Sequence, residues 1–194
     1  MTRHKFFCCF SQATISFPII LEIMLLLSTT VWTGSSQLTE ATVIANGTVY
    51  FAQPPSLVKT TTTFRTPITP STYYFTLSLP AEVGKPLQSV TFTQHQGLEI
   101  IRFDLKRTDA KAQTLSDSRQ QLTLGEVTRN SKTNTISVMF NPPVLPGRTV
   151  TIGLRAVANP QHGGVYLFGV TAYPADEKSH GQFLGFGRIQ FTGR

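Results

Sequence analysis

The sequence predicts an all-β protein built as a single antiparallel β-sandwich behind a signal peptide. Short segments in which apolar and polar residues alternate recur along the chain, as is typical of half-buried strands. Turn residues separate these segments, since the chain of 194 residues contains 14 glycines and 12 prolines. No amphipathic helical stretch joins any two predicted strands, which disfavours a parallel βαβ sheet.

Residues 1–36 are predicted to be a secretory signal peptide. A basic start that contains Arg3 and Lys5 precedes an apolar stretch, strongest over residues 15–27, and small polar residues follow at 33–36. Pro18 and Glu22 interrupt the apolar stretch, and a carboxylate near the centre of a bilayer is costly, so a cleaved leader is favoured over a retained anchor. We expect cleavage near residues 35–37, a short linker over 37–45 and no permanent membrane span afterwards.

The leader also contains both cysteines of the chain, Cys8 and Cys9, so the mature protein is expected to be free of disulfides. Without the leader, 15 basic and 9 acidic residues remain, and the net charge is +6 instead of +7. A mildly positive surface favours anionic partners. The basic residues are scattered, with no run of five or more, and we therefore expect no nucleic-acid partner.

The first half of the domain, 46–194, contains four predicted strands. Residues 48–51 follow an Asn-Gly turn and end before two prolines, which lack the ladder donor. The threonine- and proline-rich residues 60–70 are expected to form an extended edge or a loop. Residues 73–79 alternate cleanly, and residues 90–93 and 98–105 are further strands, with a hairpin connection at 94–97.

The second half continues the pattern after a polar, mixed-charge segment, 106–121, which is expected to be a solvated excursion with a short helical turn. Strands are predicted at 122–124, 135–140 and 148–156, with a rigid proline-rich connector at 141–147. Residues 164–174 are apolar on both faces and are expected to be central in a sheet. Residues 182–191 form a closing strand, with a bulge near Gly185 and Gly187.

These strands predict an Ig-like sandwich or a related Greek-key arrangement. The predicted core is the following set: Phe75, Leu77, Val138, Phe140, Ile152, Leu154, Leu167 and Phe191.

Several segments together carry a resemblance to a known family. They are residues 46–51 with 53–55, then 73–75, 101–104, 124–129 and 150–155, and most distinctively 164–191, which contain GVYLFGVTAYP and HGQFLGFGRIQF. Across residues 46–191 the chain resembles the secreted cyanobacterial family known only as domain of unknown function 2808. The resemblance implies an exported protein of the periplasm or cell envelope. It implies no activity and transfers no catalytic residue.

The residues agree with a non-enzymatic protein. The sequence has no Gly-x-Ser-x-Gly elbow, no phosphate-binding glycine loop and no His-Glu-x-x-His zinc pair, and the mature chain has no cysteine nucleophile. Asp176 and Glu177 are adjacent carboxylates, but they lie beside Lys178 in a predicted loop, where a solvated turn is the simpler interpretation. No catalytic residue and no cofactor are therefore predicted.

Two function classes remain open. The first is a binding or structural module of the cell envelope whose partner is a protein or a glycan, with a ligand loop that involves Glu177, His180 and Arg188. Exposed aromatic residues such as Tyr74 and Tyr166 would suit sugar stacking, unless both sheet faces are covered. The alternative is a periplasmic copper-handling protein that uses three loop histidines, His95, His162 and His180.

Overall fold

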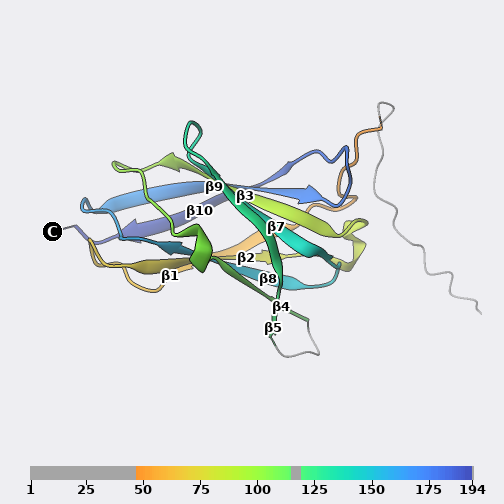
Figure 1. The fold of residues 1–194 in the computed structure, drawn as a ribbon, viewed down its shortest axis with the longest axis horizontal. Helices are drawn as coiled ribbons and strands as arrows, with labels where there is room; N and C mark the ends of the chain where they lie inside the picture. Colours follow the sequence, from red (N-terminus) through yellow and green to blue (C-terminus); the bar gives the residue numbers. More distant parts are fainter. Residues whose placement is uncertain (1–46, 115–118, 194) are drawn as a thin grey trace, which may run out of the picture. The chain divides into compact units, whose positions relative to one another are not determined.

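The computed structural model describes residues 47–114 and 119–193, and these form two antiparallel sheets of five strands each. Figure 1 shows the sheets as two layers, one above the other. The predicted class, an all-β antiparallel sandwich, is confirmed. The predicted signal peptide, the linker over 37–45 and both cysteines lie outside the described residues. Within those residues, no helix is long and apolar enough to cross a membrane.

We call the layers sheet I and sheet II. Sheet I has the strand order β1-β2-β8-β4-β5. Its strands are β1 (Ser56–Thr62), β2 (Ser71–Ser78), β8 (Thr149–Ala156), β4 (Asp109–Gln113) and β5 (Gln120–Gln121). Sheet II has the order β10-β9-β3-β7-β6. Its strands are β10 (Gln182–Phe191), β9 (Gly164–Pro174), β3 (Leu87–Gln96), β7 (Thr135–Val144) and β6 (Leu124–Asn130).

The core lies between the inner faces of the two sheets, because alternate residues of each strand point inward. Aromatic rings connect the layers: Phe75 of sheet I lies 4.5 Å from Phe92 and 5.8 Å from Phe168 of sheet II, measured between ring centroids. Seven of the eight predicted core residues are buried: Phe75, Leu77, Val138, Phe140, Ile152, Leu154 and Phe191.

The prediction for Leu167 is wrong by one position along β9. Tyr166, Phe168 and Val170 point inward, and Leu167 lies half-buried on the outer face. Because β9 is apolar on both faces, hydropathy alone does not indicate which set of alternate residues faces the core. Tyr166 is consequently fully buried and is not the exposed sugar-stacking residue that the sequence suggested.

Residues 106–121 are not simply a solvated excursion. The short helical turn is present, as the 3-10 helix η3 (Leu105–Arg107), but β4 follows and pairs with β8 within sheet I. Ala110 and Ala112 are its buried residues. Alanine gives a weak hydrophobic signal and has a low strand propensity, so this strand is hidden in the polar composition of the segment.

Three boundaries also differ from the prediction. Residues 48–51 form no strand, and only Val49 makes a bridge, to Ser179. Residues 98–104 form a loop with a single bridge from Phe103 to Ala156, and Leu105 already belongs to η3. The expected connector after Phe140 is instead the end of β7, which continues through both prolines to Val144.

The closing strand is confirmed as β10, at the edge of sheet II beside β9. Its bulge lies between Phe183 and Gly185, where Gly185 has φ of 112°, so the irregularity is slightly earlier than predicted.

Candidate functional site on the outer face of sheet I

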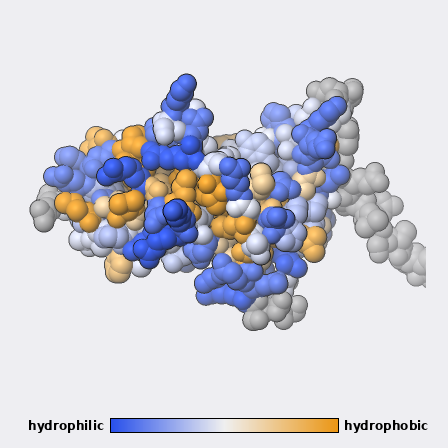
Figure 2. Space-filling model, in the orientation of Figure 1, coloured by the Kyte–Doolittle hydropathy of each residue, from blue (hydrophilic) through white to orange (hydrophobic). Residues whose placement is uncertain are grey.

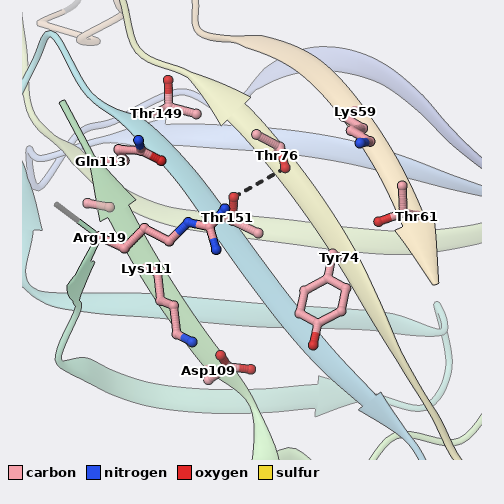
Figure 3. Close-up of a pocket in the computed structure, with 11 residues that line it drawn as sticks. Lys59, Thr61, Tyr74, Thr76, Asp109, Lys111, Gln113, Arg119, Thr149 and Thr151 are labelled. Atoms are coloured by element: carbon pink, nitrogen blue, oxygen red, sulfur yellow. Dashed lines mark hydrogen bonds between the residues drawn. The ribbon is translucent and has the colours of Figure 1, made fainter. Parts of the chain in front are cut away.

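A groove of about 330 Å³ crosses the outer face of sheet I (Figure 3). We call it the outer-face groove. Four strands and Arg119 contribute to it, and its lining residues are Lys59, Thr61, Tyr74, Thr76, Asp109, Lys111, Ala112, Gln113, Arg119, Thr149 and Thr151. The site is therefore built largely on rigid strands, which hold side chains more firmly than loops do.

Strand register places the lining side chains in two rows. In one row Thr61, Tyr74, Gly153 and Asp109 are successive cross-strand partners. In the next row Lys59, Thr76, Thr151 and Lys111 follow one another in the same way. Because side chains alternate between faces, these rows lie two residues apart on the solvent side of each strand.

Gly153 keeps the floor of the groove open. A Cβ atom at this position would collide with the Asp109 carboxylate and would lie 3.1 Å from Cε1 of Tyr74. Tyr74 is 36% exposed, so it offers a partly accessible aromatic surface beside the backbone of β8. This combination of a flat floor and an aromatic wall suits a flat, polyhydroxylated ligand.

The charges around the groove are mostly positive. Lys59, Lys111 and Arg119 contribute cations, and Asp109 is the carboxylate in the lining. The ion pairs of residues 47–114 and 119–193 are Lys85–Asp176 and His162–Glu99, neither of which involves these cations. Threonine hydroxyls supply neutral donors and acceptors, and those of Thr76 and Thr151 lie 3.2 Å apart. The groove can therefore bind anionic groups together with hydroxyls.

The three histidines each have a different neighbour. His95 packs against Phe186 with ring centroids 5.3 Å apart, and His180 stacks on Tyr50 at 4.9 Å. Nδ1 of His162 lies 2.7 Å from Oε1 of Glu99. In the part of the chain that the structure describes, no group of three or more histidine, cysteine or acidic side chains is placed to hold a metal. The geometry of the histidines gives the copper alternative no support.

The predicted ligand loop does not gather its three residues at one site. Glu177 is exposed in the β9–β10 connection, while His180 stacks on Tyr50. Arg188 lies within β10, opposite Leu167, and donates a hydrogen bond of 3.2 Å to Gln190. The connection is itself held by the N-terminal segment, since Val49 N–H donates to the carbonyl of Lys178.

Of the residues that line the groove, Tyr74 is a candidate from the sequence alone, whereas the charged residues are not. The signal for Tyr74 is its position opposite Tyr73 and Phe75 in an alternating strand. Asp109, Lys111 and Arg119 fall in the predicted solvated excursion, because the pattern does not reveal β4 as a strand. Their convergence with Lys59 depends on long-range pairing, which local periodicity does not contain.

The fold and this site define a two-sheet β-sandwich domain with a ligand-sized groove on one outer face. Its membership of a family follows from sequence comparison. The chain belongs to the family described as protein of unknown function (DUF2808), whose model matches residues 48–191. The match confirms the family resemblance found in the sequence. No curated protein matches the chain.

Several solved structures are similar in fold. The backbone protein of pilus 2b from group B streptococcus has a TM-score of 0.45 and 9% identity, covering 69% of this chain and 56% of that one. The collagen-binding domain of a Staphylococcus aureus adhesin has a TM-score of 0.38 and 9% identity, covering 70% and 98%. The major pilin SpaD of Corynebacterium diphtheriae has a TM-score of 0.46 and 13% identity, covering 70% and 34%. The chain thus spans little more than half of the streptococcal protein, and similarity at this level does not indicate what it binds.

Proposed function

We propose that this protein is an exported, non-enzymatic module of the cell envelope that binds an acidic glycan in the outer-face groove. The export leader predicted from the sequence and the resemblance to an exported family support the proposed location. The observation that carries the binding proposal is the partly exposed side chain of Tyr74 in one groove with three cations, on a surface built mainly from strands.

The ligand class follows from the chemistry of the lining. A sugar ring has an apolar face, and this face can pack against the apolar face of an aromatic side chain. Lys59, Lys111 and Arg119 would pair with the carboxylates or sulfates of an acidic polysaccharide, and the threonines would bond its hydroxyls. A neutral glycan would leave the cations unused.

The groove also suits binding rather than chemistry. Among the described residues that line it, Asp109 is the one carboxylate, and none is a histidine. General acid–base hydrolysis of a glycosidic bond ordinarily uses two carboxyl groups that flank the bond. We therefore propose capture of the glycan without cleavage.

Affinity electrophoresis tests this proposal. The protein is run through gels that contain alginate, a polyuronate, or neutral dextran. We expect retardation by alginate alone, with retardation that falls as salt rises, because screening weakens charge pairing. Tyr74→Ala and Lys111→Gln should each reduce the retardation severalfold. A matched control is Phe183→Ala, which removes an aromatic ring that is 55% exposed on sheet II. Equal retardation of Tyr74→Ala and wild type would contradict the proposal.

A further inference from the structure

One end of the sandwich gathers three connections that are far apart in the sequence. β2 begins at this end, whereas β3 and β8 finish there, so residues 63–70, 97–104 and 157–163 meet. Hydrogen bonds join them: Ile68 N–H donates to the carbonyl of Asn159 at 3.2 Å, and Val157 N–H donates to that of Arg102 at 2.9 Å. The three connections therefore act as one surface.

This surface carries large apolar side chains in contact with solvent. Five of the eleven large hydrophobic residues that the sandwich exposes belong to these connections. They are Phe64 at 50%, Ile68 at 54%, Leu98 at 79%, Ile100 at 51% and Val157 at 51% exposed. We call this set the apolar tip. Figure 2 shows hydrophobic residues among hydrophilic ones at the end of the molecule where Figure 1 marks the C-terminus. Clustered exposed apolar groups of this kind mark interaction sites.

Two exposed arginines accompany the apolar tip. Arg65 and Arg102 are exposed on the same connections. The connections also contain two acidic residues, Glu99 and Asp104, and both accept hydrogen bonds within the protein. Oε1 of Glu99 accepts a hydrogen bond of 2.6 Å from His162 N–H and lies 2.7 Å from Nδ1 of that histidine. Oδ1 of the half-buried Asp104 accepts a hydrogen bond of 3.2 Å from Lys106 N–H. An approaching anionic surface would therefore meet two exposed guanidinium groups, while the two carboxylates already accept hydrogen bonds within the protein.

From this geometry we infer that the apolar tip is a site of peripheral attachment to an anionic phospholipid bilayer. The apolar side chains lie on separate connections at the end of a rigid sandwich, so they can enter the headgroup region together while the sheets stay in water. Arginine suits such a boundary, since its alkyl stem packs on apolar groups while its charge meets lipid phosphates. Because hydrogen bonds already hold the connections together, their insertion would cost less conformational entropy.

Vesicle co-sedimentation tests the inference. The exported form of the protein, its N-terminus checked by mass, is mixed with vesicles of phosphatidylcholine alone or of phosphatidylcholine with phosphatidylglycerol. We expect sedimentation with the anionic vesicles. The double variant Leu98→Ser with Ile100→Ser should lower the partition coefficient roughly tenfold or more, because apolar area drives insertion. The double variant Arg65→Gln with Arg102→Gln should remove the preference for phosphatidylglycerol.

The control is Leu145→Ser, which removes a side chain that is 54% exposed in the β7–β8 connection, at the other end of the sandwich. It should sediment like the wild type. Thermal melting checks that every variant is folded, and alginate retardation should be unchanged, because the groove is untouched. A wild-type protein that stays in solution with both vesicle types would overturn the inference. So would a concentration-dependent dimer that the Leu98 and Ile100 variant abolishes, since a second copy of the chain would then cover the tip.

Discussion

Tyr74 on β2 and Gly153 on β8 are direct cross-strand partners, and the ring of Tyr74 borders the space that a side chain at Gly153 would fill. Asp109 on β4 is the partner of Gly153 on its other side. The glycine thus separates the aromatic and the acidic wall of the outer-face groove. A residue that would ordinarily weaken a strand is, in this place, what gives the groove its floor.

Replacing Gly153 with alanine should weaken alginate binding roughly tenfold while leaving the fold intact. One added methyl group in a fitted site has effects of this order. The new Cβ would displace the Asp109 carboxylate, which is the free end of a side chain, so the free energy of unfolding should change by less than about 1 kcal/mol. Affinity electrophoresis and urea unfolding measure the two effects.

Gly187 provides the matched contrast, because it faces the core. A Cβ there would lie 2.7 Å from Cε1 of the buried Phe75 ring. Gly187→Ala should therefore lower the free energy of unfolding by about 1–3 kcal/mol, the usual cost of overpacking. If Gly153→Ala were the more destabilising variant, the assignment of the two glycines to outer and inner faces would be wrong.

Phe140 should be among the most costly residues to truncate. Its side chain is fully buried on β7, and Phe140→Ala is expected to cost about 3–5 kcal/mol through lost burial and a residual cavity. Met139, its neighbour, is 42% exposed, so Met139→Ala should cost less than about 1 kcal/mol. Equilibrium denaturation of the two variants compares the two faces of β7 directly. Similar losses in the free energy of unfolding would contradict an inward-facing Phe140.

Tyr73 anchors the connection that carries Phe64. Its hydroxyl donates a hydrogen bond of 2.9 Å to Oδ1 of Asn159, whose amide in turn donates to the carbonyls of Phe64 and Thr66. Burial raises the pKa of the Tyr73 hydroxyl, so it remains a donor across the physiological range. Tyr73→Phe leaves the buried Asn159 oxygen unpaired and should cost about 1–3 kcal/mol.

The same variant should speed proteolytic cleavage within residues 63–70 by more than the loss of global stability alone would cause. If the cleavage rate rises only as much as the loss of global stability predicts, the hydrogen bonds of Asn159 stabilise the whole domain and do not specifically hold the connection.

Glu99 should make the stability of the domain depend on acid pH. The pKa of its carboxyl is lowered chiefly because the backbone N–H of His162 donates to it. A carboxyl with a lowered pKa in the folded state stabilises the fold above its unfolded pKa, near 4.3, and this contribution is lost as pH falls through the folded value. The melting temperatures of wild type and Glu99→Gln should therefore differ at pH 7, and the difference should shrink as pH falls below the unfolded pKa and through the lower folded pKa. A constant difference across this range would contradict the pairing.

Most strands of the sandwich could be predicted from the sequence, but most of the outer-face groove could not. Strands such as β2 and β8 were predictable because bulky residues alternate along them. β4 was not, since only Ala110 and Ala112 mark its buried face. The face of β9 was ambiguous because both sets of its alternate residues are apolar, and tertiary packing decided that Tyr166 and not Leu167 turns inward.

The site depended on pairings that no local pattern specifies. Tyr74 was recognisable as a candidate, but its proximity to Asp109 requires β2, β8 and β4 to be neighbours in one sheet. The histidines were the most conspicuous chemical groups in the sequence, yet each one packs against a different partner. The residue types suggested metal binding, but the arrangement of the strands determines whether the histidines lie close together.

Nuclear magnetic resonance can show whether the outer-face groove binds an acidic glycan. The backbone amide resonances of the isotope-labelled protein are followed during titration with short alginate oligosaccharides. We predict saturable shifts centred on Tyr74, Lys111 and Thr151, absent with neutral oligosaccharides of the same length. Shifts confined to sheet II, or no shifts at millimolar ligand, would contradict glycan binding in the groove.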